Sequence, residues 1–291
     1  MPEISFGSLL STFRASLDLV SSELDLRLDG TDFYDYVLLL SILQANASGA
    51  RGEIRKHFSI RSIADGIGLP NETARRHVMR LAEKGLVLVD ETGCHVARTS
   101  PIYSEYIDNL EAGAKTTHAL VSRLEPLGLV GDNGQRLASA DIWITNQRRI
   151  GHLAFEHTLR TLTSVQMLCR RLLPTILFVK VFTINTSRVG HDALIDITPG
   201  ACAALADRGL LRPARAIDLA GKIRVASTTI GRHLQRGVTA GLYRHTPDGL
   251  LVDCAMLASE RGIDMMGKTR ASLVRLFNDL TQLARAEALV S

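Results

Sequence analysis

The fold is decided by two stretches of sequence that align without a gap at a shift of 156 positions: ADGIGLPNETARRHVMRLAEKGLVLVDETGCHV (Ala64–Val96) and AGKIRVASTTIGRHLQRGVTAGLYRHTPDGLLV (Ala220–Val252). Ten of the 33 positions are identical, whereas about two matches are expected from average composition. The identical residues of the first copy are Ala64, Ile67, Thr73, Arg76, His77, Arg80, Gly85, Leu86, Gly93 and Val96. We therefore predict two copies of one module; chance similarity between two helix-rich segments is the alternative.

Each copy begins with two helices separated by a turn. In the first copy a short helix is expected over Arg61–Ile67, and Gly68 supplies the turn. A second helix is expected over Glu72–Lys84, with Asn71 as its N-cap and Gly85 closing it. The second copy has Ser227 and Gly241 at those two positions. Its helix contains two glycines, each of which costs about 1 kcal/mol relative to alanine.

A β-hairpin is expected to follow each second helix. Short apolar stretches flank turn residues that end in glycine, which is a hairpin signal. The expected strands are Leu86–Val89 with Cys94–Val96 in the first copy, and Leu242–His245 with Leu250–Val252 in the second. The order helix, turn, helix, hairpin is that of a winged helix.

The second helix of each copy has an apolar face and an open face that carries arginine. Ala74, Val78 and Leu81 follow helical spacing and are expected to be buried, as are Ile230 and Leu234. Arginine can contact guanine edges in a bidentate manner or bind phosphate. The candidate DNA-contacting residues are Thr73, Arg75, Arg76, Arg80, Thr228, Thr229, Arg232, Arg236 and Arg244. His77 and His233 lie at the edge of the open face and are expected to pack against the hairpin.

These segments resemble bacterial winged-helix regulators of the MarR and GntR type. The resemblance rests on Ser62–Ala64 before the turn, Thr73–Val78 in the second helix and Lys84–Val87 at the start of the hairpin, and it covers about 40 residues per copy. It implies a transcriptional regulator that binds double-stranded DNA. Two positions depart from the pattern: Arg224 replaces the turn glycine in the second copy, and the first hairpin tip is acidic, at Asp90–Glu91.

Basic residues gather around both predicted recognition helices. Between positions 51 and 80 seven basic residues face three acidic ones: Arg51, Arg55, Lys56, Arg61, Arg75, Arg76 and Arg80. Between positions 208 and 244 eight basic residues accompany Asp218 alone: Arg208, Arg212, Arg215, Lys222, Arg224, Arg232, Arg236 and Arg244. The whole chain has a net charge of only +4. The prediction of a polyanionic partner therefore rests on the local excess of basic residues in these two segments.

The expected fold class is mainly α with small β-hairpin wings, as tandem duplicated winged helix-turn-helix domains with flanking helices. We expect a first domain over residues 1–130, a junction over 131–148 and a second domain over 149–291. Helical patterns precede each copy, at Ser8–Leu28 with Asp32–Ala45 and at His152–Leu172 with Thr175–Ile184, and follow it at Ser104–Leu124 and Met265–Ala288. Extra residues around 187–199 in the second half have no assigned role.

Composition and motifs exclude several classes of protein. Apolar residues make up 46% of the 291 residues, enough for a large core. The four cysteines and nine histidines show no spacing typical of a zinc site or a disulfide framework. No nucleophile elbow, phosphate loop or dinucleotide fingerprint is present. We expect no enzymatic activity, cofactor, metal or membrane span, and a cytoplasmic protein with free thiols.

Partner predictions rest on the terminal helices. Phe6, Leu9, Leu10, Phe13 and Leu17 form one apolar stripe, and Leu273, Leu276, Phe277, Leu280 and Leu283 form another. Each stripe could cover its own core, but the resemblance favours a homodimer that pairs through them. A small-molecule effector is a further alternative, and no residues in the sequence indicate which molecule it would be. Two alternative functions remain at this point: a plasmid-type replication initiator and a winged-helix scaffold for protein interactions.

Overall fold

A computed structural model describes residues 4–26, 32–47, 58–91, 93–96, 101–129, 137, 141–223 and 225–288. The protein is mainly helical with two small antiparallel hairpins, which confirms the coarse expectation of a mainly α protein with small β-hairpins. Among the described helices, none combines the length and apolar character that crossing a bilayer requires.

The first half of the chain forms five helices and one hairpin within its described residues. These are α1 (Phe6–Asp25), α2 (Phe33–Ala47), α3 (Ile60–Ile67), α4 (Asn71–Glu83), β1 (Leu88–Asp90), β2 (Gly93–His95) and α5 (Pro101–Leu124). A 3-10 turn (Glu125–Leu127) and α6 (Ile142–Thr145) follow. Half of the predicted junction at 131–148 lies outside the described residues, and its described part contains α6 and the start of α7.

The second half repeats this order with additions. Its elements are α7 (Gln147–Cys169), α8 (Leu172–Thr186), α9 (His191–Ile195), α10 (Pro199–Asp207), α11 (Ala216–Ile223), α12 (Ser227–Thr239), β3 (Tyr243–Thr246), β4 (Gly249–Val252), α13 (Cys254–Ala258) and α14 (Glu260–Ala288). We call α3, α4, β1 and β2 the first head, and α11, α12, β3 and β4 the second head.

The two heads match in local geometry at the shift found in the sequence. Adding 156 to the bounds of α3 and α4 gives the bounds of α11 and α12. Gly85 and Gly241 have φ of 70° and 72° after their helices, a left-handed conformation that glycine adopts without strain. A third chain segment bridges each hairpin, Phe58 to Cys94 and Ala214 to Leu250, also 156 residues apart. The sequence did not indicate this bridge.

The helix before each head also corresponds, at a shift of 139. Helices α2 and α8 both have 15 residues, and their bounds differ by 139. Near the end of each helix an asparagine side chain accepts a hydrogen bond from the last hairpin strand. Asn46 Oδ1 accepts from the Val96 N–H at 3.2 Å, and Asn185 Oδ1 accepts from the Val252 N–H at 2.8 Å. Position n in α2 therefore corresponds to position n + 139 in α8.

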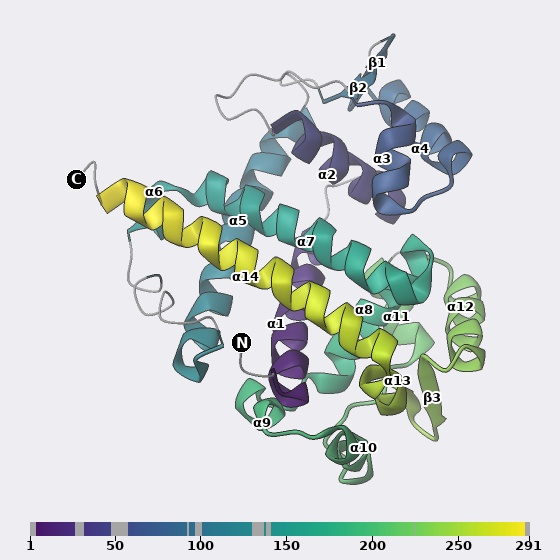
Figure 1. The fold of residues 1–291 in the computed structure, drawn as a ribbon. Helices are drawn as coiled ribbons and strands as arrows, with labels where there is room; N and C mark the ends of the chain where they lie inside the picture. Colours follow the sequence, from purple (N-terminus) through teal and green to yellow (C-terminus); the bar gives the residue numbers. More distant parts are fainter. Residues whose placement is uncertain are drawn as a thin grey trace.

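Helices from both halves build one central body. α7 packs on both α5 and α14, and α1 packs on α14, α8 and α7. Figure 1 shows α7 and α14 running alongside each other, with the first head above α7 and the second head beyond the right-hand end of both helices. Gly151 allows α7 to approach α5 closely, because a Cβ there would lie 2.2 Å from the Leu110 carbonyl oxygen. Across the halves, the rings of Phe13 and Phe182 pack edge to face with centroids 5.1 Å apart.

Both apolar stripes of the terminal helices are used inside the chain. All five stripe residues of α14 are at most 4% exposed, as are Leu10, Phe13 and Leu17 of α1. The packing of α1 on α14 accounts for much of this burial. These stripes are therefore occupied within one chain, and the expected homodimer stays a prediction that needs another surface.

The extra residues of the second half cover the beginning of α1. α9 packs on α1 so closely that a Cβ at Gly7 would lie 2.0 Å from the Ile195 carbonyl oxygen. Ser11 Oγ donates a hydrogen bond to the His191 carbonyl oxygen at 3.0 Å. α10 packs on α13, where the Sγ atoms of the buried thiols Cys202 and Cys254 lie 2.7 Å apart. Their separation of 52 residues hides this contact in the sequence.

The predicted N-caps of α4 and α12 are wrong. α4 begins at Asn71 and α12 at Ser227, so their N-caps are Pro70 and Ala226, and neither cap residue makes a side-chain hydrogen bond. Each helix therefore starts one residue earlier than the cap assignment required. Pro70 and Ala226 both have an extended backbone, with ψ of 133°. This conformation leads the chain into the helix without a side-chain cap.

Candidate nucleic-acid interface

The inward faces of α4 and α12 agree with the helical spacing in the sequence. Ala74, Val78 and Leu81 are 0% exposed, and Ile230 and Leu234 are at most 3% exposed. Burial of these side chains orients each helix against its head and leaves the opposite face to solvent. The core contacts therefore determine which face of each helix points outward.

The outward face of α12 is polar and has no acidic residue. Thr228, Arg232 and Gln235 are exposed and follow one another at helical spacing, and residues 227–239 include no Asp or Glu. Arg232 forms no ion pair with another described residue. Gln235 Oε1 lies 3.3 Å from His245 Nε2 on β3, which links the helix to its hairpin. This face offers an uncompensated guanidinium to an anionic partner.

The outward face of α4 has mixed charge. Arg76 is exposed, and within the described part of the chain it makes no ion pair. Arg75 instead donates two hydrogen bonds to the Glu72 carboxylate, from Nε at 3.0 Å and from Nη2 at 2.9 Å. These hydrogen bonds lower the pKa of Glu72 from its usual value. Because the pair is fully exposed, a phosphate could compete for Arg75 at little cost.

Arg80 is held by carboxylates at the start of α2. Its Nη2 contacts Asp32 Oδ2 and lies 2.6 Å from Asp35 Oδ1, and His77 Nδ1 lies 2.9 Å from the same Asp35 atom. Burial alone would raise the pKa of the Asp35 carboxyl, but its hydrogen bonds with His77 and Arg80 outweigh burial and lower that pKa. His77, which the sequence placed at the edge of the open face, is buried, and its ring centroid lies 5.2 Å from that of Tyr34 on α2.

The same cluster has the composition of a metal site but already contains a cation. Ligand atoms of Asp32, Asp35 and His77 all lie within 4.8 Å of one another. The guanidinium of Arg80 occupies the position from which a metal ion would neutralise both carboxylates. The cluster therefore ties α4 to α2, and the role of Arg80 in DNA contact stays a prediction. The sequence signal was weak, because 48 residues separate Asp32 from Arg80.

The other candidate residues lie around these two faces. Thr73 and Thr229 are half-buried near the start of their helices, and Arg244 is half-buried on β3. Arg236 lies on the side of α12 that faces the body, beside a cavity described below. The acidic tip of the first hairpin is exposed, with Asp90 Oδ1 accepting a hydrogen bond from the Gly93 N–H at 3.2 Å. Four residues of the two basic clusters lie outside the described residues: Arg51, Arg55, Lys56 and Arg224.

Comparison of the chain with models of known protein families, with curated proteins and with solved structures finds no match. The geometry of the two heads therefore carries the functional argument alone.

Proposed function

We propose that this protein is a cytoplasmic, DNA-binding transcriptional regulator in which two winged helix-turn-helix units are built into one chain. The proposal is supported by the repeated order of two helices and a hairpin, with bounds and turn glycines that match at a shift of 156. The observation that carries it is the pair Arg76 and Arg232. Each is the exposed arginine at the same position of the second helix, and neither has an acidic partner among the described residues.

The proposed mechanism places α4 and α12 in the major groove. There Arg76 and Arg232 can donate two hydrogen bonds to the O6 and N7 atoms of guanine. Thr228 and Thr229 lie at the N-terminus of α12, where hydroxyl groups and backbone N–H groups can bind a phosphate. Thr73, Arg75 and Arg244 would add backbone contacts. Arg80 and Arg236 face the body. We therefore assign to them the positioning of their helices, in preference to direct contact with bases.

Two heads on one body would allow a single chain to read two sites. Winged-helix and related proteins commonly read half-sites about 34 Å apart, on one side of the duplex. Both heads here are attached to one body, the first above α7 and the second at the right-hand end of α7 and α14 (Figure 1), and the stripes expected to form a homodimer are buried within the chain. We therefore propose that one chain suffices for two contacts, so that a homodimer would present four heads.

The test combines Arg76→Ala with Arg232→Ala. Each bidentate contact contributes about 1–3 kcal/mol, so the double variant should bind duplexes selected by the wild-type chain about 2–6 kcal/mol more weakly. The measurement is fluorescence anisotropy at fixed salt, with the salt dependence of affinity recorded for both proteins. The matched control is Arg275→Ala with Arg285→Ala, which removes the same charge from exposed positions of α14.

Two outcomes would contradict the proposal. Equal loss in the control variant would mean that net charge, and not the two heads, governs binding. No measurable affinity of the wild-type chain for duplex DNA at 50 mM salt would favour a scaffold that contacts other proteins through the same faces.

A further inference from the structure

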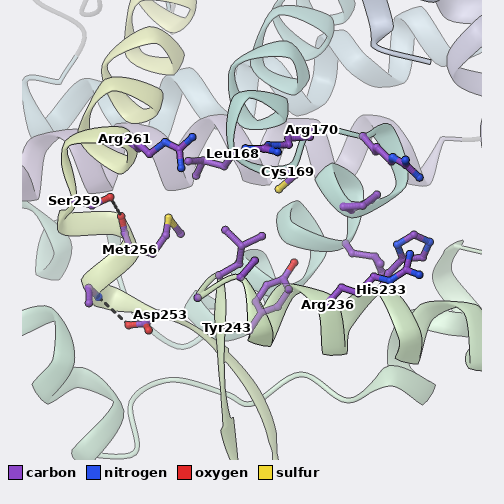
Figure 2. Close-up of a pocket in the computed structure, with 18 residues that line it drawn as sticks. Leu168, Cys169, Arg170, His233, Arg236, Tyr243, Asp253, Met256, Ser259 and Arg261 are labelled. Carbon is purple, nitrogen blue, oxygen red and sulfur yellow. Dashed lines mark hydrogen bonds between the residues drawn. The ribbon is translucent and has the colours of Figure 1, made fainter. Parts of the chain in front are cut away.

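A large cavity lies between the second head and the body. Its volume is about 780 Å³, and it is bounded by the end of α7, the start of α8, the end of α12, α13 and the start of α14 (Figure 2). Pockets that bind small molecules commonly have volumes of about 300–1,000 Å³. The cavity is therefore large enough for a small organic ligand.

The walls of this cavity combine positive charge with apolar surface. Its charged lining residues are Arg170, Arg171, Arg236 and Arg261, with His233 beside them and Asp253 as the acidic member. Figure 2 shows His233 and Arg236 together on α12, with Arg170 above the cavity and Asp253 at the far end. Asp253 is engaged as the N-cap of α13, where its side chain accepts a hydrogen bond from the Ala255 N–H at 2.9 Å. Leu168, Leu177, Leu242, Tyr243 and Met256 supply the apolar wall.

Comparison of the two copies of the repeat shows that two carboxylates present beside the first head have no counterpart beside the second. In the first head, His77 and Arg80 face the carboxylates of Asp32 and Asp35. The second head keeps the same pair as His233 and Arg236, 156 residues later. At the shift of 139 that relates α2 to α8, the two carboxylates are replaced by Arg171 and Pro174. The second head therefore retains the cations but has lost both anions.

The titration of His233 agrees with this uncompensated charge. Its pKa is lowered by burial first, and then by Arg236, Arg232 and Arg171. Three guanidinium groups thus act on one imidazole, with no acidic residue among the causes of the shift. An anion placed beside Arg171, Arg236 and His233 would compensate this positive charge.

The backbone at Arg170 is a second, independent feature of the cavity. Arg170 has φ of 61°, and it is the one described residue other than glycine with positive φ. Arg170 is the C-cap of α7, a position at which helices commonly end in this left-handed conformation, usually with glycine. Here the position adds a guanidinium to the lining of the cavity.

We propose that this cavity binds a small amphipathic organic carboxylate. Its carboxylate group would lie between Arg171, Arg236 and His233, where the first head uses Asp32 and Asp35 of its own chain. Its apolar body would lie against Leu177, Tyr243 and Met256. The ligand would connect α12 to the α7–α8 turn, as Asp35 connects α4 to α2, and would thereby hold the second head against the body. This inference does not depend on DNA binding.

The test replaces Arg171 with aspartate, which is the residue at the counterpart position in the first half, Asp32. Wild-type chain, Arg171→Asp and Arg171→Asn are titrated with benzoate, naphthoate and decanoate by isothermal titration calorimetry. We expect at least one carboxylate to bind the wild-type chain, and its affinity to fall at least about tenfold in both variants, because charged hydrogen bonds are lost. Benzamide and naphthamide, which lack the negative charge, should not bind.

The two variants separate loss of the site from loss of the fold. Both Asp and Asn can cap α8, but only Asp supplies a carboxylate to Arg236. Arg171→Asp should therefore raise the midpoint of thermal unfolding above that of Arg171→Asn, as an internal substitute for the ligand. A wild-type chain that binds none of the three carboxylates would overturn the proposal. Equal binding of inorganic phosphate would overturn the role of the apolar wall.

Discussion

At the scale of the single residue, Glu23 is a buried carboxyl group with no hydrogen-bond partner in the described part of the chain. It is 0% exposed, and neither of its carboxylate oxygens has a hydrogen-bond partner among the described residues. Gly113 on α5 makes room for it, since a Cβ there would lie 2.7 Å from Glu23 Oε1. Burial raises the pKa of Glu23 to about 8, from a usual value of 4.5. The folded protein therefore keeps this proton at pH values where the unfolded chain has lost it.

This shift predicts that the contribution of Glu23 to stability falls as pH rises. Between pH 4.5 and 8 the folded state binds the proton more tightly, so the free energy of unfolding should decrease by up to about 1.4 kcal/mol per pH unit. Glu23→Gln cannot ionise and should remove this slope, so its stability relative to the wild type should increase from pH 5 to pH 8. The measurement is chemical denaturation at each pH.

The control for this prediction is Glu83→Gln, an exposed glutamate on α4. That variant should show the pH dependence of the wild-type protein. If Glu23→Gln also kept the wild-type slope, the Glu23 carboxyl would not be buried and neutral in the folded protein.

The sequence could name the candidate arginines but not their partners. Helical spacing placed Arg76 and Arg232 on the outward faces, which the structure agrees with. It could not show that Asp32 and Asp35 hold Arg80, because that contact depends on how α2 packs on α4. The missing carboxylates around Arg236 were equally hidden. They emerge only when α2 and α8 are aligned by their structural bounds, which need a different shift from the heads.

At the scale of the element, local sequence determined the helices and hairpins well. Periodicity and the glycines after each second helix located α3, α4 and α12 to within about one residue. The hairpins were also located, but the bridging segments at Phe58 and Ala214 were not. A single bridged residue has no strand pattern of its own, so tertiary contact alone defines it.

The two glycines of α12 should respond oppositely to alanine. A Cβ at Gly231 would meet nothing within 4 Å, whereas one at Gly237 would lie 2.3 Å from Tyr243 Cε2. Gly231→Ala should therefore stabilise the protein by about 1 kcal/mol through helix propensity. Gly237→Ala should destabilise it by about 1–3 kcal/mol, because the Tyr243 ring must move in a packed core.

Chemical denaturation of both variants at one pH measures this difference, and each glycine serves as the control for the other. Equal effects of the two substitutions would mean that helix propensity alone decides, and that Gly237 does not contact the Tyr243 ring as described. The structure therefore corrects the expectation that both glycines carry the same cost: Gly237 is required by packing, whereas Gly231 is not.

At the scale of the whole molecule, the halves share a core that the repeat did not indicate. Sequence similarity between modules predicts what folds alike, but it does not predict which surfaces the copies bury against each other. Helix α1 belongs to the first half, yet it packs on α8, α9 and α14 of the second. The buried Lys180 Nζ on α8 lies 2.7 Å from Asp25 Oδ1 and donates a hydrogen bond to the Ser21 carbonyl oxygen on α1 at 2.9 Å. Contacts between the halves are thus both apolar and charged.

The last prediction follows from this shared core and concerns the chain divided between its halves. Residues 1–129 and 141–291, expressed separately, should each expose the apolar faces that α1, α5, α7 and α14 bury together, and that lost burial is worth about 25 cal/mol per Å². Neither half alone should show the cooperative thermal unfolding of the whole chain by circular dichroism, whereas the two halves produced together should form a 1:1 complex on size-exclusion chromatography. A monomeric half with its own cooperative transition would contradict the prediction. It would mean that each head and its flanking helices form an independent domain, and that the position of one head is not set by the other.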